Sequence, residues 1–318
     1  YVYGQGAVYE KGISLFSPSV SYTGPPHDTF EDGSFTDLWG AVRQYRRSSF
    51  GDVFREVVKP PLAQAESAKE VEAYSGWPKK EWFDYSSIVE YCRDNKDYAL
   101  FFGGMPGMAT IFIQCWYIRG LQQTLEDLYV NPVLIEAVIA HIIEFQMNFH
   151  NEVLDTASEW IDVVQIGDDY GTENSLMMSP EIFRKIFKPQ LKKLISLIKS
   201  YGKKVMLHSD GNVRMLIPDF IEIGVDILNP IQWGGIPDMN PKELNEEYGK
   251  DICFHGGIDT QDFLPGAKKN DLKGYMRHVI DSLGKNGGYI MSPTHTLELD
   301  VPLENCISLY KECSRSPS

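Results

Sequence analysis

Residues 206–212, MLHSDGN, end an apolar run with a histidine and a carboxylate two positions apart. On an extended strand, the side chains of His208 and Asp210 point to the same face. A neutral imidazole and a carboxylate oxygen are both ligands for a divalent metal. The pair also suits proton transfer, in which Asp210 orients His208. A third interpretation is purely structural, with the two side chains hydrogen-bonded to each other and to loop amides.

A further histidine, His295, follows another apolar run near the end of the chain. A catalytic zinc takes three protein ligands and keeps a fourth position for water or substrate. We therefore predict zinc as the metal and His208, Asp210 and His295 as its ligands.

Polar residues follow other apolar runs as well. Asp168 and Asp169 are adjacent, and because neighbouring side chains on a strand alternate in direction, only one of them can share a face with His208. An aspartate at this place can instead cap the following turn. The predicted catalytic residues are Asp169, Tyr170, His208 and His255. The predicted substrate contacts are Asp168, Gln232, Trp233, Gly256 and Gly257, because glycine lets a backbone approach a ligand closely and glutamine both donates and accepts.

Six β-rich runs alternate with amphipathic helical runs, and the polar residues lie where the β-rich runs end. This alternation predicts parallel βαβ units. A doubly wound sheet gives the same alternation, but no glycine-rich nucleotide motif follows the first strand, and a barrel gathers all its strand ends on one face. We therefore predict an α/β fold, a (β/α)8 TIM barrel with an irregular N-terminal extension. The predicted strands are residues 98–104, 162–169, 203–210, 225–232, 252–259 and 288–295.

The clearest helices are predicted over residues 131–158 and 179–202. Ser179 is the expected N-cap of the second helix, and Pro189 predicts a kink or break within it. Residues 1–66 are irregular, with alternating apolar residues that predict a β-hairpin. We expect this arm to belong to the same domain as the barrel, which spans residues 67–318.

The composition limits the partners and the location. The 318 residues carry a net charge of −14, which argues against nucleic acid or an anionic membrane as a partner and leaves a small molecule as the expected substrate. The five cysteines form no C-x-x-C pair, so a reducing, cytoplasmic location is expected. No apolar run is seen that reaches the roughly 18 residues of a membrane span.

Four segments follow one another between roughly residues 80 and 310: DDYGTENSLMMSPEIFRKIFKPQLKKL, KVMLHSDGNVRMLIPDFIEIGVDILNPIQ, ICFHGGIDTQDFLPGA and GGYIMSPTHTLELDVPLEN. These segments and their order resemble the uroporphyrinogen decarboxylase-like superfamily. This resemblance implies a (β/α)8 barrel. The superfamily includes porphyrinogen decarboxylases and zinc-dependent methyltransferases, which move methyl groups between small substrates, corrinoid proteins and thiols such as coenzyme M.

The chain departs from both branches. The methyltransferases often carry His-x-Cys on the middle strand and Cys on the last strand, where this chain has His208-x-Asp210 and His295. The arginine-rich segment that begins the decarboxylases is not found. We predict a zinc-dependent methyltransferase that exchanges a methyl group between a small methylated substrate and a thiol or a corrinoid protein, which supplies the corrinoid. The alternatives are a decarboxylase of a porphyrinogen-like or other small acid, and a non-catalytic ligand-binding barrel. The resemblance also implies a homodimer.

Overall fold

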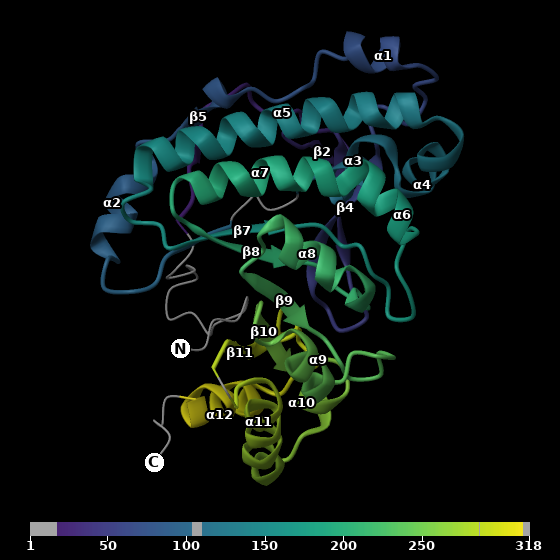
Figure 1. The fold of residues 1–318 in the computed structure, drawn as a ribbon. Helices are drawn as coiled ribbons and strands as arrows, with labels where there is room; N and C mark the ends of the chain where they lie inside the picture. The colour runs from purple at the N-terminus through teal and green to yellow at the C-terminus, as the bar shows by residue number, and fades with distance from the viewer. Residues whose placement is uncertain (1–17, 104–109, 286, 314–318) are drawn as a thin grey trace.

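The structure, a computed structural model, describes residues 18–103, 110–285 and 287–313. Its centre is a six-stranded parallel sheet with the order β11-β10-β9-β8-β7-β6 (Figure 1). A strand is found within each of the six predicted ranges, and each is shorter than predicted; Gly104, the predicted end of the first strand, lies outside the described residues. The strands are β6 (Phe101–Phe102), β7 (Val163–Gly167), β8 (Lys204–His208), β9 (Ile227–Ile231), β10 (Cys253–Ile258) and β11 (Tyr289–Pro293).

Each strand of this sheet pairs with the strand that follows it in the chain. A doubly wound sheet reverses its strand order at a switch point, whereas a barrel sheet does not. The order therefore rules out the doubly wound alternative. Within the described ranges the pairing ends at β6 and β11, so these residues form a sheet of six strands, where a (β/α)8 barrel has eight, and no closed barrel.

The register of the sheet brings strand ends together. Gly167 of β7 pairs with His208 of β8, and His208 pairs with Asn229 of β9. Because all strands run the same way, the loops after β7, β8 and β9 leave the sheet at one edge. This edge carries the candidate site.

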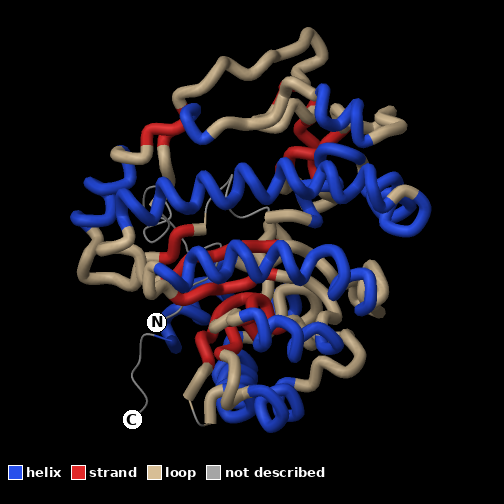
Figure 2. The backbone as a smooth tube through the Cα atoms, turned by 45° about the horizontal axis from the view of Figure 1, so that its top comes forward, coloured by secondary structure: helices blue, strands red, loops and turns tan. Residues whose placement is uncertain are grey.

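Helices pack outside the sheet, and Figure 2 shows the long helices (blue) running alongside the strands (red). Ser179 caps the predicted helix over 179–202, since its hydroxyl accepts a hydrogen bond from the Ile182 amide. The break expected at Pro189 takes the form of a π-helical stretch, Phe183–Phe187, that joins two α-helices. The α-helices are α1 (Ala68–Ala73), α2 (Ser87–Asp94), α3 (Phe112–Arg119), α4 (Leu121–Val130), α5 (Pro132–Ala157), α6 (Pro180–Ile182), α7 (Lys188–Ser200), α8 (Ile217–Ile223), α9 (Pro241–Tyr248), α10 (Phe263–Gly266), α11 (Lys269–Leu283) and α12 (Leu303–Cys313).

Helix α5 is long and apolar enough to cross a membrane by length and composition alone, which the sequence had not indicated. It runs beside α7 (Figure 1) and contacts α1 and α7, and half of its most apolar window is buried inside the molecule. A core helix passes the same test of length and composition, and the packing of α5 is that of a core helix.

The N-terminal part contains the predicted hairpin. Strands β3 (Val42–Arg47) and β4 (Val53–Lys59) pair antiparallel, and β2 (Phe35–Thr36) joins their sheet. At the hairpin turn, Asp52 Oδ2 accepts a hydrogen bond from the Leu299 amide in the loop after β11. The hairpin therefore reaches the edge of the sheet that carries the site. A separate pair is formed by β1 (Ser21–Tyr22) and β5 (Phe83–Asp84). The division at residue 66 stays a prediction.

Candidate metal centre and active-site pocket

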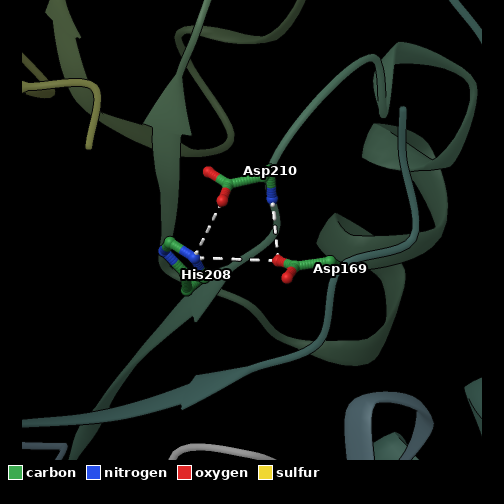
Figure 3. A group of neighbouring side chains, drawn as sticks. All are labelled: Asp169, His208 and Asp210. Carbon is green, nitrogen blue, oxygen red and sulfur yellow. Dashed lines mark hydrogen bonds and ion pairs between the residues drawn. The ribbon is translucent and has the colours of Figure 1, made fainter. Parts of the chain in front are cut away.

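Asp169, His208 and Asp210 meet at the carboxyl ends of β7 and β8 (Figure 3). One ligand atom from each side chain lies within 4.8 Å of the others. His208 Nε2 is 3.7 Å from Asp169 Oδ1 and 3.6 Å from Asp210 Oδ2. Asp169 Oδ1 also accepts a hydrogen bond from the Asp210 amide at 3.1 Å, which ties the two loops together. An imidazole and two carboxylates in this arrangement are a ligand set for a divalent metal.

A buried asparagine fixes the orientation of the histidine. His208 Nδ1 lies 2.7 Å from Asn229 Oδ1, and Asn229 Nδ2 lies 2.6 Å from His255 Nδ1. Because an amide oxygen only accepts hydrogen bonds, Nδ1 of His208 carries a hydrogen, so in the neutral imidazole that binds a metal the lone pair is on Nε2, the nitrogen that faces the two aspartates. This is how proteins orient a metal-binding histidine through its second ring nitrogen. The sequence analysis missed Asn229, although a polar residue inside an apolar strand was a signal.

The carboxylates favour a positive charge at this place. Burial lowers the pKa of His208, but Asp210 and Asp169 outweigh burial and raise the pKa to about 9. Burial raises the pKa of Asp210, but the hydrogen bond and charge of His208 outweigh it, so this pKa falls below its usual value. Among the residues that the structure describes, Asp210 Oδ1 is buried without a hydrogen-bond partner. An unpartnered buried carboxylate oxygen in an anionic group fits a metal ligand.

His295 lies beside this group. Its Nε2 is 3.9 Å from Asp210 Oδ2, and its side chain is 52% exposed. The compact group therefore contains the predicted ligands His208 and Asp210, with Asp169 in the third place that the sequence analysis gave to His295. Strand order explains why Asp169 lies in the group. Its strand, β7, is the neighbour of β8, whereas β9 and β10 separate β8 from β11, the strand that precedes His295.

Asp168 points the opposite way from Asp169, as strand alternation predicts. Its carboxylate accepts hydrogen bonds from the amides of Ile111 and Ile113 at the start of α3 and from the hydroxyl of Tyr170. Burial raises the pKa of Asp168 to about 7. Both Asp168 and Tyr170 are fully buried, so in this conformation neither of these predicted site residues is exposed to substrate.

Of the predicted substrate contacts in the later strands, one lines the pocket and the others contact protein atoms. Gln232 lines the pocket described below, where its Nε2 donates to Gln261. Trp233 instead donates from Nε1 to the Gly257 carbonyl. A Cβ on Gly256 would lie 2.7 Å from the Ile231 amide nitrogen, and one on Gly257 would lie 2.9 Å from the Tyr289 hydroxyl. These glycines approach protein atoms, and their role toward substrate stays a prediction.

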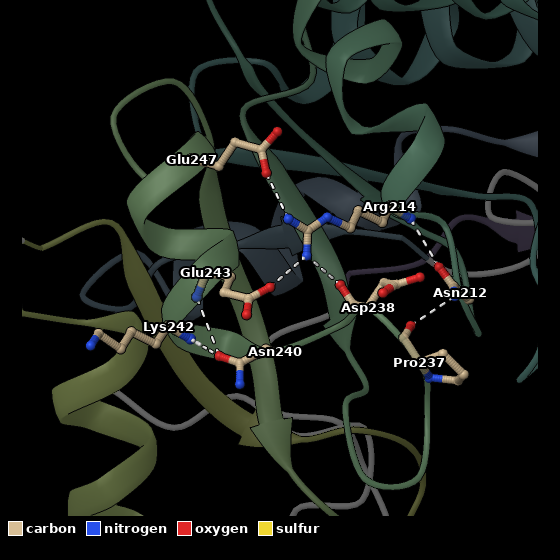
Figure 4. Close-up of polar contacts among 8 residues, drawn as sticks. All are labelled: Asn212, Arg214, Pro237, Asp238, Asn240, Lys242, Glu243 and Glu247. Carbon is tan, nitrogen blue, oxygen red and sulfur yellow. Dashed lines mark hydrogen bonds and ion pairs between the residues drawn. The ribbon is translucent and has the colours of Figure 1, made fainter.

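The loop that carries Asp210 is held on both sides. Toward β7, the amide of Asn212 donates to the Thr172 carbonyl at 2.8 Å. Toward α9, the Asn212 side chain donates to the Pro237 carbonyl, and Arg214 pairs with Glu247 and Glu243 (Figure 4). The position of Asp210 is therefore set by the structure around it.

A pocket of about 560 Å³ opens beside the group. Its walls come from the loops after the strands and from the tip of the β3–β4 hairpin, which contributes Phe50. Its volume is that of a small-molecule site. Its lining residues are Phe50, Gly171, Thr172, Glu173, Asp210, Gly211, Gln232, Thr260, Gln261, His295, Thr296, Glu298 and Asp300.

The profile of the uroporphyrinogen decarboxylase (URO-D) family matches residues 55–315. The chain belongs to this family. Uroporphyrinogen decarboxylase from Wolinella succinogenes is 21% identical over 226 residues, covering 70% of this chain and 62% of that protein. The chain thus spans less than two thirds of the length of this URO-D relative.

A solved structure of a methyltransferase from Methanosarcina mazei superposes with a TM-score of 0.64 and 16% sequence identity. The match covers 86% of this chain and 75% of the methyltransferase. At this identity the likeness shows the fold, which is the α/β barrel type of the URO-D family. The family indicates an enzyme and does not by itself determine the reaction.

Proposed function

We propose that this URO-D family chain is a metal-dependent methyltransferase acting on a small methylated compound, with a thiol or the corrinoid of a partner protein as methyl acceptor. The supporting observation is the compact group of Asp169, His208 and Asp210 with its unpartnered Asp210 Oδ1. Zinc is the proposed metal, because it accepts nitrogen and oxygen ligands and leaves a position open for substrate.

The metal, when bound, polarises the heteroatom that carries the methyl group or lowers the pKa of a bound thiol. His208 presents Nε2 to this position because Asn229 holds Nδ1. Asp169 and Asp210 supply two negative charges that balance a divalent ion. His295 is the exposed imidazole of the pocket, and it is positioned to give a proton to an oxygen or nitrogen that leaves without its methyl group.

The decarboxylase alternative draws support from the named URO-D relative. A carboxylated tetrapyrrole needs cationic side chains around it, and the described residues that line the pocket include no lysine or arginine. Four of them, Glu173, Asp210, Glu298 and Asp300, are acidic. The charge of the pocket therefore favours the methyltransferase.

The proposal extends to the rest of the molecule. We propose that the six-stranded sheet is part of a closed (β/α)8 barrel, that the protein works in the cytoplasm, and that it forms a homodimer. These statements rest on family membership and on the cysteine content.

Metal analysis tests the proposal. We expect the purified protein to bind about one equivalent of zinc, and His208→Ala and Asp210→Asn to lose it. His278→Ala, which changes an exposed histidine outside the group, is the control and should keep the metal. Methyl transfer to free cob(I)alamin, followed by the absorbance change as methylcobalamin forms, tests the reaction. A wild type that binds no metal, or that releases carbon dioxide from uroporphyrinogen without a metal, would refute the proposal.

A further inference from the structure

We infer that the pocket selects a positively charged, N-methylated small molecule, such as a quaternary ammonium compound, as the methyl donor. This inference rests on the proposed function and adds to it the chemical class of the substrate. The pocket itself is established by its hollow of about 560 Å³, which opens onto Asp210 and His295. Its charge and its aromatic wall then indicate which ligand it takes.

The charge of the pocket is negative beyond what the metal needs. If Asp169 and Asp210 balance a divalent ion, Glu173, Glu298 and Asp300 still add three negative charges to the lining. In the described part of the chain, none of these three carboxylates forms an ion pair. Their field raises the local concentration of cations and opposes anions. A carboxylated ligand is therefore disfavoured.

The hairpin supplies an aromatic side chain to the same pocket. Phe50 lies at the turn between β3 and β4, where Asp52 Oδ2 accepts from the Leu299 amide and so joins the hairpin to the loop that carries Glu298 and Asp300. An aromatic face attracts an ammonium group through its quadrupole, and methylated ammonium ions are recognised in this way. Phe50 and the carboxylates thus suit the same ligand.

Methyl transfer from such a donor produces a neutral leaving group. When the carbon–nitrogen bond of a quaternary ammonium breaks, its electron pair stays on nitrogen and the product is a neutral tertiary amine. The methyl carbon forms its new bond with an electron pair of the acceptor, a thiolate or a cob(I)alamin-type corrinoid. The donor carries its positive charge at every pH and leaves without protonation, so with this donor the proton from His295 is not required. Because a quaternary nitrogen has no lone pair for a metal, the metal would act on the acceptor thiol, which is the second of its two proposed roles.

An isosteric pair of probes tests the inference. Choline and 3,3-dimethyl-1-butanol have the same shape and differ in the charge of the central atom. By isothermal titration calorimetry on the zinc-loaded protein, choline should bind at least about tenfold more tightly than the alcohol. Raising the salt from about 0.05 M to about 0.5 M should weaken choline binding and leave the alcohol unchanged.

Variants assign the selectivity to named residues. Glu298→Gln and Asp300→Asn should each weaken choline binding roughly two- to fivefold without affecting the alcohol. Phe50→Leu, which keeps an apolar side chain, should weaken choline binding by a similar factor. Glu136→Gln, on the exposed side of α5, is the matched control and should change nothing.

The outcomes separate this inference from the proposed function. Equal affinities for the two wild-type probes, or tighter binding of methoxyacetate than of choline, would overturn the cationic substrate class. Choline binding that persists in metal-free His208→Ala protein would uphold the substrate class even if no methyl transfer were found. Metal-dependent methyl transfer from a neutral ether, without choline binding, would uphold the proposed function and refute this inference.

Discussion

Replacement of Asn229 by leucine tests whether the metal group depends on its buried neighbour. The Asn229 side chain bridges two histidines, accepting from His208 Nδ1 at 2.7 Å and donating to His255 Nδ1 at 2.6 Å. Asn229 is 7% exposed, so water has little access to replace either bond. Leucine has a similar size and no polar atoms, so Asn229→Leu removes both bonds without opening a large cavity.

Two effects follow from this change, and each has a magnitude. A buried polar group that loses its partner costs about 1–3 kcal/mol, so two of them lower the free energy of unfolding by roughly 2–6 kcal/mol. Without the amide oxygen, the hydrogen of neutral His208 is free to move to Nε2, which blocks the lone pair that faces Asp169 and Asp210. Loss of such a supporting contact typically weakens metal binding about 10- to 100-fold.

Competition for zinc between the protein and a chelating dye at neutral pH measures the second effect, and urea unfolding measures the first. Asn305→Leu is the matched control. Asn305 is buried, and its side chain also makes two hydrogen bonds, to the carbonyls of Leu264 and Ala267, away from the metal group. Asn305→Leu should lose stability and keep its zinc affinity. Wild-type zinc affinity in Asn229→Leu, or an equal loss in both variants, would refute the reasoning.

Three further predictions concern stability and the Asp210 loop. Burial lowers the pKa of His150 to about 4, so the unfolded chain binds more protons below pH ~6.5. Urea unfolding should show about 3 kcal/mol more stability lost between pH ~6.5 and ~4 in the wild type than in His150→Gln. A Cβ at Gly211 (φ +80°) would lie 2.6 Å from the Thr172 carbonyl oxygen, so Gly211→Ala should weaken zinc binding. Gly202 is the control, because it has a similar φ of +74° and a Cβ there would meet nothing within 4 Å. Gly202→Ala should lower the free energy of unfolding by only about 1 kcal/mol and leave zinc binding unchanged. Ser179→Ala should cost about 1 kcal/mol in thermal unfolding through the lost N-cap bond, with zinc affinity unchanged.

The sequence predicts the elements well because their signals are local. Alternation of apolar residues and capping residues identified the six strands, the hairpin and the helix that Ser179 caps. Strand order is not a local property. The sequence analysis placed His295 with His208 and Asp210, but the pairing of β7 with β8 brings Asp169 closer. Sheet topology therefore explains why Asp169 joins the group, while His295, 3.9 Å from Asp210, stays a predicted ligand.

Two other residues of the site needed the three-dimensional structure. Asn229 lies inside a predicted strand, and its contact with His208 depends on the register between β8 and β9. Phe50 reaches the pocket from the N-terminal hairpin, which is separated in sequence from the loops that form the other walls. Residue type and spacing singled out His208 and Asp210, because side chains two positions apart on a strand point to the same face and both types bind metals, and their role as ligands stays a prediction.

The metal-ligand atoms of Asp169, His208 and Asp210 differ from those that the resemblance to the methyltransferases implies. The resemblance implies a thiolate in the methyltransferases where this chain has Asp210, and the group found among the described residues contains no cysteine. Cys115 is fully buried, and burial together with the charge of Asp168 raises the pKa of its thiol well above the usual value. Carboxylates and imidazole are harder ligands than thiolate, and such a set separates zinc from manganese or iron less well. A carboxylate carries the same single negative charge as a thiolate, so Asp210 changes the hardness of the ligand set and not its charge, and the remaining negative charge of the pocket comes from Glu173, Glu298 and Asp300.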